Sequence, residues 1–219
     1  MFSGIIEKMG RVVNIRLHQD GFYMVVKPTN GVMEVGEGES VAISGACLTV
    51  TGVMDKGFEV FISSETIERT WFENLRVDLM VNIERPLKIG DGLSGHIVLG
   101  HIDDTGVVKQ IINSGRLREL IIQTNRELMR FIVYKGSITI DGVSLTVKET
   151  SDDNFSVVLI PYTIANTTLG HLRVGDRVNI EVDAVARYIN AMVGNGKEET
   201  EERGITISFL REHGFLEEN

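Results

Sequence analysis

The feature that most constrains this chain is an internal duplication. A displacement of about 97 positions aligns residues 40–84 with residues 137–181, and about 19 of the roughly 45 aligned positions are identical, which chance does not produce. A displacement of one position less aligns Gly4-Ile5-Ile6-Glu7 with Gly100-His101-Ile102-Asp103. A repeat of about 90 residues is long enough to bury a core of its own. The chain is therefore expected to contain two similar domains.

Each repeat contains the same short β-branched segment. In the second repeat, residues 138–147 read Ile-Thr-Ile-Asp-Gly-Val-Ser-Leu-Thr-Val, and residues 41–50 match them in the first. The pair Asp141-Gly142 between alternating apolar residues is a strong hairpin signal, because a type I′ turn needs positive φ at both central positions. We expect a tight hairpin here.

After this turn, alternate side chains of the strand face opposite sides. Ser144 and Thr146 therefore share one face, and Cys47 and Thr49 occupy the corresponding places in the first repeat. A hydroxyl or thiol two residues before a threonine thus occurs once in each half. This repetition indicates two related sites, and a small barrel holds a ligand at its mouth.

Most of the periodicity in each repeat is two, which is typical of strands. The expected strands of the first repeat cover residues 12–13, 23–26, 41–50, 58–62 and 81–83, and a short helical turn is expected over 66–71. In the second repeat a helix is expected over residues 125–132. Short strands at near-regular spacing predict a closed β-barrel of about six strands in each repeat, and so a mainly all-β fold. Break signals in residues 86–94 suggest domains at 1–90 and 91–183, followed by a helical tail at 184–219.

Residues 184–193 have apolar residues at helical spacing. Val185, Tyr188, Ile189 and Met192 share one stripe, and Gly194-Asn195-Gly196 ends the pattern. This stripe is a candidate oligomer contact, and the alternative is packing on its own barrel. A final helix or strand is expected over residues 205–214.

Composition excludes several classes of function. The net charge is −9 and no basic stripe is visible, which argues against nucleic acid and anionic membranes as partners. A single cysteine fits a reducing compartment, and neither a signal sequence nor a membrane-spanning run is apparent, so we expect a cytoplasmic protein. The five histidines show no zinc spacing, and no glycine-rich segment completes a dinucleotide or phosphate-loop motif.

The two repeats differ where chemistry would need a difference. His101 follows Gly100 where the first repeat has Ile5, and Lys135 corresponds to Gly38. A neutral imidazole can move protons near pH 7. Taken alone, His101 is more typical of a structural histidine, Lys135 of a solvated charge and Cys47 of a buried small residue.

Several segments together resemble riboflavin synthase of the alpha-chain type. They are residues 1–7 (Met-Phe-Ser-Gly-Ile-Ile-Glu), 47–50 (Cys-Leu-Thr-Val), 95–103 (Gly-His-Ile-Val-Leu-Gly-His-Ile-Asp), 135–147, 159–161 (Leu-Ile-Pro) and 167–170 (Thr-Thr-Leu-Gly). The resemblance covers essentially the whole chain and implies a mainly all-β fold of two homologous six-stranded Greek-key β-barrels plus a C-terminal α-helix. Ser3 stands where threonine is usual and Ser44 where asparagine is usual, and both changes are conservative.

The resemblance implies a dismutation of 6,7-dimethyl-8-ribityllumazine. One molecule gives four carbons to another, which yields riboflavin and 5-amino-6-ribitylaminouracil without a metal or redox cofactor. It also implies a homotrimer held by the C-terminal helix, in which the pocket of one N-terminal barrel faces that of a neighbour's C-terminal barrel. An association with lumazine synthase is a further implied partner.

Carried over by resemblance, the first-half pocket comprises Gly4, Ile5, Ile6, Cys47, Leu48, Thr49, Phe61, Ile62, Ser63, Ser64, Glu65 and Thr66. The second comprises Gly100, His101, Ile102, Lys135, Ser144, Leu145, Thr146, Val158, Leu159, Ile160, Pro161, Tyr162 and Thr163. The candidate catalytic residues are His101 and Ser144 for proton transfer, Cys47 for addition to the partner ring or orientation of water, and Thr146 and Asp183.

One rival is a lumazine- or flavin-carrying antenna protein, which resembles the family but lacks catalysis. Such a protein is expected to have lost the second pocket, or Ser144 and His101, and often the C-terminal helix, all of which this sequence retains. A flavin reductase on a similar barrel would need a nucleotide-binding domain, for which the sequence shows no motif.

Overall fold

The computed structural model describes residues 1–195. The first six strands close into one barrel in the order β1-β2-β5-β4-β3-β6, with all pairs antiparallel. They are β1 (Lys8–His18), β2 (Gly21–Pro28), β3 (Ser40–Ile43), β4 (Ala46–Met54), β5 (Gly57–Ser63) and β6 (Met80–Glu84).

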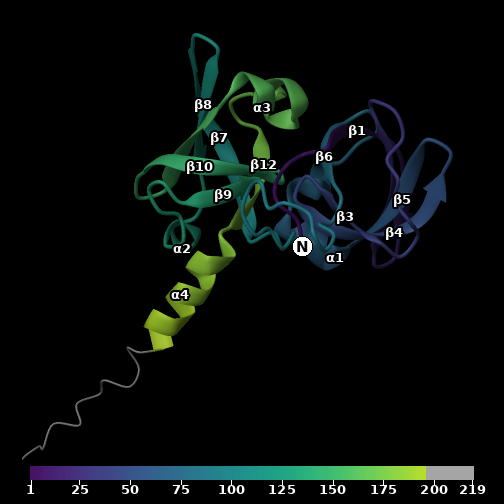
Figure 1. Cartoon of the computed structure of the whole chain (residues 1–219), viewed down its shortest axis with the longest axis horizontal. Coiled ribbons are helices and arrows are strands. Elements are labelled where there is room, and N and C mark those ends of the chain that lie inside the picture. Colours follow the sequence, from purple (N-terminus) through teal and green to yellow (C-terminus); the bar gives the residue numbers. More distant parts are fainter. Residues whose placement is uncertain (196–219) are drawn as a thin grey trace, which may run out of the picture.

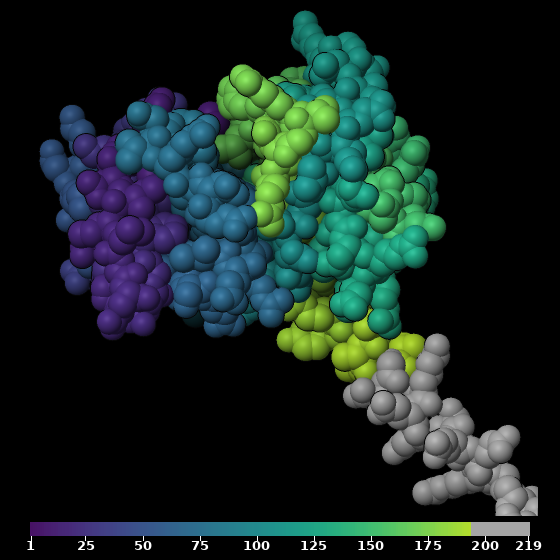
Figure 2. Space-filling model, turned by 180° about the vertical axis from the view of Figure 1, so that it is seen from behind, coloured from purple at the N-terminus to yellow at the C-terminus, as the bar shows by residue number. Residues whose placement is uncertain are grey.

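The next six strands repeat this barrel. They are β7 (Asp104–Ser114), β8 (Leu117–Gln123), β9 (Ser137–Ile140), β10 (Val143–Thr150), β11 (Asn154–Leu159) and β12 (Arg177–Val182). Their closed order, read from β7 as β7-β8-β11-β10-β9-β12, matches the first barrel strand for strand. The two barrels lie side by side (Figures 1 and 2). The predicted pair of six-stranded barrels is confirmed.

The duplication extends to irregular details of the backbone. Both barrels have a bulge between their first two strands, after Val12 and after Val108, and another after Val50 and after Val147. Each bulge shifts the register by one residue and increases the local twist, which a small barrel needs in order to close.

The expected hairpin has the predicted turn geometry in both repeats. Asp141 and Gly142 have φ values of 45° and 80°, and Ser44 and Gly45 have values of 41° and 87°. Positive φ at both central residues is the signature of a type I′ turn. The tips of the two hairpins touch, because a Cβ added to Gly45 would lie 2.8 Å from the Gly142 nitrogen. The hairpins therefore meet at the contact between the barrels.

Each barrel has its own apolar core. Val12, Met24, Phe58, Ile62 and Ile83 are among the fully buried side chains of the first. Leu120, Ile122, Ile138, Phe155 and Ile180 are among those of the second. The side chains that face inward alternate with outward ones along each strand, as the two-residue periodicity requires.

Short helices connect the strands: α1 (Ser64–Arg69), η1 (Trp71–Asn74), α2 (Arg126–Met129), α3 (Pro161–Asn166) and η2 (Thr168–His171). The helical segment predicted over 66–71 corresponds to α1 and η1. The one predicted over 125–132 is shorter, because after Met129 the backbone continues with three-residue turns, such as the bond from the Ile132 N–H to the Met129 carbonyl.

Helix α4 (Ala184–Asn195) leaves the second barrel and extends away from both barrels (Figure 1). An ion pair between Arg187 and Asp103, at 2.9 Å, ties its first turn to the loop before β7. The segment predicted over 205–214 lies outside the described residues. Within residues 1–195, no helix combines the length and the apolar character needed to span a membrane.

Candidate functional site

The two repeats exchange their leading segments. The chain start pairs with the segment before β7 through two hydrogen bonds, Phe2 N–H to the Val98 carbonyl at 2.7 Å and Val98 N–H to the Phe2 carbonyl at 3.1 Å. Beyond this pairing, the Gly4 carbonyl accepts from Ser144 N–H at 2.7 Å. The Gly100 carbonyl accepts from Cys47 N–H at 2.9 Å. Each leading segment thus adds backbone to the other repeat's barrel.

This exchange corrects the sequence grouping of the site. Gly4, Ile5 and Ile6 were expected beside Cys47, but they lie beside Ser144, and Ile6 packs on the core of the second barrel. Gly100, His101 and Ile102 were expected beside Ser144, but they lie beside Cys47, and Ile102 packs on the first core. The repeat alignment identifies equivalent residues, but it carries no information on which barrel a leading segment joins.

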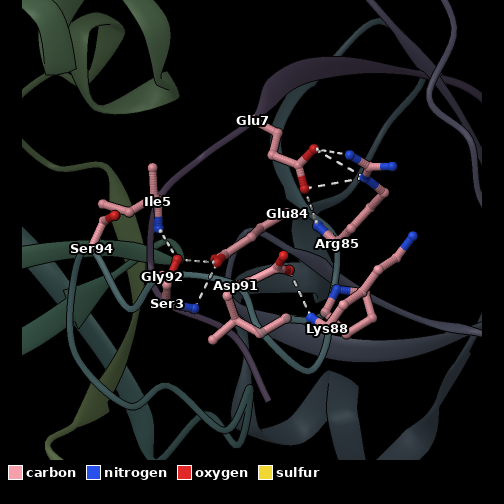
Figure 3. A pocket seen from close by; sticks show the side chains of 11 residues that line it. Ser3, Ile5, Glu7, Glu84, Arg85, Lys88, Asp91, Gly92 and Ser94 are labelled. Atoms are coloured by element: carbon pink, nitrogen blue, oxygen red, sulfur yellow. Dashed lines mark hydrogen bonds and ion pairs between the residues drawn. The ribbon is translucent and has the colours of Figure 1, made fainter.

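A buried carboxylate at the end of the last strand of each barrel holds each exchanged segment. Glu84 accepts hydrogen bonds from Ser3 N–H at 2.7 Å and from the Ser3 hydroxyl at 2.8 Å (Figure 3), and it also accepts from Gly4 N–H. Glu181 accepts from Leu99 N–H at 2.8 Å and Gly100 N–H at 3.0 Å. Burial raises the pKa of Glu84, and it raises the pKa of Glu181 to about 7.

The second barrel opens into a cavity of about 640 Å³ at the hairpin strand β10. The residues around it include Ser144, with its hydroxyl, and Lys135, with its ammonium. The cavity is lined by Ile5, Ser94, Gly95, Tyr134, Lys135, Ser137, Ser144, Leu145, Thr146, Val147, Lys148, Val158, Ile160 and Thr163. It is large enough to hold a bicyclic heterocycle with a polyol side chain.

Lys135 has φ of 61°, in the left-handed region that a lysine rarely adopts. Its first-repeat counterpart is Gly38, with φ of 83°. Both backbone N–H groups donate to equivalent carbonyls, Lys135 to Val147 and Gly38 to Val50, each at 2.9 Å. A non-glycine residue in this conformation points to a role for its side chain, and Lys135 lines the cavity.

The first barrel has a smaller cavity of about 280 Å³ at the equivalent place. It is lined by Ala46, Cys47, Glu65, Thr66, Arg69, Thr70, Gly100, His101 and Ile102. Thr66 here and Thr163 in the second cavity are equivalent positions, so each cavity presents a hydroxyl from the first turn of a helix, α1 or α3.

A third hollow of about 490 Å³ lies between the chain start and the connection that follows β6 (Figure 3). It shares Ile5 and Ser94 with the second-barrel cavity. An ion pair between Glu7 and Arg85, at 2.8 Å, lies at its edge. The exchanged segment at Ile5 therefore separates two adjoining hollows.

A buried polar network joins the barrels beneath the hairpins. Asn82 donates to the Asp141 carbonyl at 2.8 Å, and Asn179 donates to the Ser44 carbonyl at 2.9 Å, so equivalent asparagines reach across in both directions. Trp71 Nε1–H donates to Asp141 Oδ1 at 2.8 Å, and so does Asn179 N–H at 2.9 Å. Burial raises the pKa of Asp141 to about 7. This network fixes the hairpins that carry Cys47 and Ser144.

The sequence-predicted residues fall into three groups. Those lining a cavity are Ile5, Cys47, Glu65, Thr66, Gly100, His101, Ile102, Lys135, Ser144, Leu145, Thr146, Val158, Ile160 and Thr163. Those with side chains in the barrel cores are Leu48, Ile62 and Leu159. The remaining predicted residues, which line neither cavity, are Gly4, Ile6, Thr49, Phe61, Ser63, Ser64, Pro161, Tyr162 and Asp183.

Sequence reasoning missed polar residues at these cavities, and Arg69 and His96 are two of them. Arg69 lines the first cavity from the last turn of α1. His96 Nδ1 lies 2.7 Å from Ser144 Oγ, and His96 Nε2 lies 3.1 Å from Thr139 Oγ1. The signal that could have found His96 is its place in the Gly95–Asp103 segment, but it has no counterpart in the first repeat.

Comparisons with known proteins agree with this architecture. The family model described as Lumazine binding domain matches twice, at residues 3–86 and 99–183. The chain is similar to riboflavin synthase of Actinobacillus pleuropneumoniae, with 39% identity over 98% of this chain and 100% of that protein. It is 33% identical to riboflavin synthase of Bacillus subtilis, again over 98% of this chain and 100% of the relative.

Among solved structures, the chain is similar to LumP complexed with 6,7-dimethyl-8-(1'-D-ribityl) lumazine and to LumP complexed with riboflavin. The TM-scores are 0.75 and 0.77, with 26% and 27% identity, and each match covers 83% of this chain and 99% of that chain. The chain therefore belongs to the lumazine-binding-domain family, together with the riboflavin synthases that it matches over their whole length.

Proposed function

We propose that the protein catalyses the dismutation of two molecules of 6,7-dimethyl-8-ribityllumazine. One molecule transfers four carbons to the other, which gives riboflavin and 5-amino-6-(D-ribitylamino)uracil, the last step of riboflavin biosynthesis. The observation that carries this proposal is the pair of cavities built on one plan but bearing unlike reactive groups, Cys47 in one and Ser144 in the other. Two identical substrates need two similar sites, and the transfer needs those sites to be inequivalent.

The reaction needs the two bound rings to touch. We propose that the first-barrel cavity of one copy faces the second-barrel cavity of a neighbouring copy in a homotrimer. Stacking the rings in this way would convert a bimolecular reaction into one with an effective molarity on the order of 10⁵ M or more. A cytoplasmic location and an association with lumazine synthase complete the proposal.

Helix α4 supplies a surface for such an assembly. Val185, Tyr188, Ile189 and Met192 are 54%, 63%, 55% and 76% exposed on one stripe of a helix that projects from the barrels. A projecting apolar stripe is stabilised when other copies of the same helix cover it. The stripe thus supports the proposal that α4 holds the trimer.

The direct test of the activity is incubation of the purified full-length protein with the lumazine alone. Appearance of riboflavin absorbance, with release of the pyrimidine, supports the dismutation. A stable fluorescent complex without riboflavin would instead identify a non-catalytic binding protein; LumP has been solved in complexes with the lumazine and with riboflavin.

The assembly is tested with Ile189→Asp in α4, compared with Asn190→Asp on the same helix. The first places a charge on the apolar stripe and is expected to give monomers with little activity, as should deletion of the residues after Asp183. The second adds the same charge at a polar position and should remain trimeric in sedimentation. If the protein remained trimeric both in Ile189→Asp and after deletion of the residues beyond Asp183, α4 would be rejected as the assembly element.

A further inference from the structure

The hydroxyl of Ser144 is hydrogen-bonded to an imidazole, and that imidazole is held at both nitrogens. His96 Nδ1 lies 2.7 Å from Ser144 Oγ, and His96 Nε2 lies 3.1 Å from Thr139 Oγ1. Thr139 and Ser144 are directly opposed on the neighbouring strands β9 and β10, so one ring bridges a cross-strand pair. Ser144 lines the cavity, whereas Thr139 is 1% exposed. The arrangement therefore leads from the cavity into the protein.

Both contacts of His96 are to hydroxyls, which can donate or accept, so the relay requires one of the two neutral tautomers. Nδ1 can accept the Ser144 hydroxyl proton only if the ring proton is on Nε2, and Nε2–H then donates to Thr139 Oγ1. Burial lowers the pKa of His96, and the nearby carboxylate of Asp183 opposes that shift. A neutral ring with a free acceptor nitrogen beside a hydroxyl is the arrangement that activates serine as a base.

The first cavity has no such pair. The cross-strand pair equivalent to Thr139 and Ser144 is Ala42 and Cys47, and Ala42 offers no hydrogen-bonding side chain. Cys47 packs against Ala42, Phe2 and Val98, which form a small apolar cluster. Among residues 1–195, no hydrogen bond joins Cys47 to the imidazole of His101, which lines the same cavity. Within residues 1–195, a cavity hydroxyl that is hydrogen-bonded to an imidazole is thus found in the second barrel and not in the first.

We propose that Ser144 and His96 form a proton relay that ionises the 7-methyl group of the lumazine bound in the second-barrel cavity. This inference rests on the proposed function and adds the assignment of roles: the second barrel holds the molecule that becomes the carbanion. Ser144, which faces the cavity, is the catalytic residue, and His96 is a positioning and relay residue that acts through it.

The step balances in protons and electrons. The C–H bond of the 7-methyl group breaks, and its electron pair delocalises into the heterocycle. Ser144 Oγ takes that proton while its own hydroxyl proton moves to His96 Nδ1. The resulting imidazolium keeps its Nε2–H on Thr139, and the proton returns along the same path when a later intermediate needs it.

The test uses the full-length protein in D₂O and follows deuterium entry into the 7-methyl group by NMR, with riboflavin formation measured in parallel. His96→Asn places an amide near the Nδ1 position but cannot take a proton. We expect enzyme-dependent exchange to fall about 100-fold, with kcat lowered similarly and lumazine affinity within about twofold of the original. His171→Asn, the same change at an exposed histidine of η2, is the matched control and should exchange at the original rate.

Thr139→Val is the second variant, for the case in which His96→Asn does not fold. It removes the partner of Nε2 and should slow exchange several-fold without weakening binding. Exchange at the original rate in either folded variant would overturn the relay. So would a loss of lumazine affinity as large as the loss of rate, because that would make His96 a structural residue. Unaltered protein that accelerates exchange but makes no riboflavin would overturn the proposed function and leave the relay standing.

Discussion

The two cavities have the same backbone and different chemistry. In the first, the thiol of Cys47 packs against Phe2, Ala42 and Val98. In the second, the hydroxyl at the equivalent position contacts the imidazole of His96. The backbone bond to the exchanged glycine carbonyl is nearly the same in both, at 2.9 Å and 2.7 Å. The duplicated backbone thus gives the two cavities the same geometry, and a few side chains give them different chemistry.

The exchange of leading segments makes each cavity depend on both repeats. Gly100 and His101 come from the second repeat but complete the cavity of Cys47. Ile5 comes from the first repeat but lines the cavity of Ser144. Neither barrel holds a complete site without the other, so the two sites are coupled through shared backbone.

The largest effect should come from filling the contact between an exchanged glycine and the opposite hairpin. In Gly4→Ala, the new Cβ would lie 2.6 Å from Ser144 Cβ, at φ of +77°. Overpacking and left-handed strain together are expected to cost about 2–4 kcal/mol and to abolish lumazine binding in the second-barrel cavity. Titration calorimetry measures how many lumazine molecules bind per chain. Protection of the Cys47 thiol from alkylation by the ligand shows whether the first-barrel cavity is occupied.

Gly100→Ala should abolish lumazine binding in the first-barrel cavity and leave the second-barrel cavity intact, because its Cβ would lie 2.6 Å from Cys47 Cβ. Gly92→Ala is the control, since nothing lies within 4 Å of an added Cβ there. If Gly4→Ala removed the Cys47 site and spared the Ser144 site, the exchange of segments would be wrong.

A smaller effect is expected at the hairpin turns, where Asp141 stands opposite Ser44. Burial raises the pKa of Asp141 from 3.8 to about 7. Between about pH 4 and pH 7 the unfolded chain loses this proton while the folded chain keeps it, so stability that is present at low pH is lost as the pH rises.

Asp141→Asn keeps an oxygen for Trp71 and Asn179 and does not titrate. Its free energy of unfolding, relative to the original protein, should rise between pH 4 and pH 8 by an amount on the order of a few kcal/mol. Chemical denaturation at several pH values measures this difference, with the exposed Asp152→Asn as control. A difference that stays constant with pH would contradict the raised pKa.

Cys47→Ser tests whether the first cavity needs its sulfur. The variant makes the two strand positions chemically alike, and because the side chain is only partly buried it should fold with little change in stability. We expect riboflavin formation to slow about tenfold or more, because a serine with no adjacent imidazole is a weak nucleophile. Turnover at the original rate would reduce Cys47 to a packing residue.

The sequence predicted the barrels well because their determinants are local and repeated. Alternating apolar residues set the strands, and Asp141-Gly142 set the hairpin with the expected positive φ. The exchange of segments was not predictable, since either arrangement preserves the same strands and the same alignment. The repeat alignment identifies Gly4 and Gly100 as equivalent, but it does not show which hairpin each of them contacts, because those contacts are tertiary.

His96 and Glu181 show two further limits. His96 has no repeat counterpart, so a search based on matched positions could not single it out. Glu181 belongs to a matched Val-Asn-Ile-Glu segment that reads as ordinary strand, and its role appears only when the Leu99 and Gly100 N–H groups are seen to donate to it. A carboxylate that recurs at the end of a buried strand is the signal that could have indicated such a support.

The smallest effect concerns the backbone strain that distinguishes Lys135 from Gly38. Lys135→Gly relieves the left-handed conformation and should stabilise the protein by up to about 1 kcal/mol, while it weakens lumazine binding in the second cavity. Gly38→Lys is the reciprocal variant: open space surrounds an added Cβ, so only strain is introduced, and a loss of similar size is expected with both sites intact. Thermal unfolding and lumazine titration measure the two quantities. If Lys135→Gly stabilised the fold and bound lumazine as before, the strained conformation of Lys135 would have no role in ligand binding. If the variant were less stable, the Lys135 side chain would instead contribute to packing.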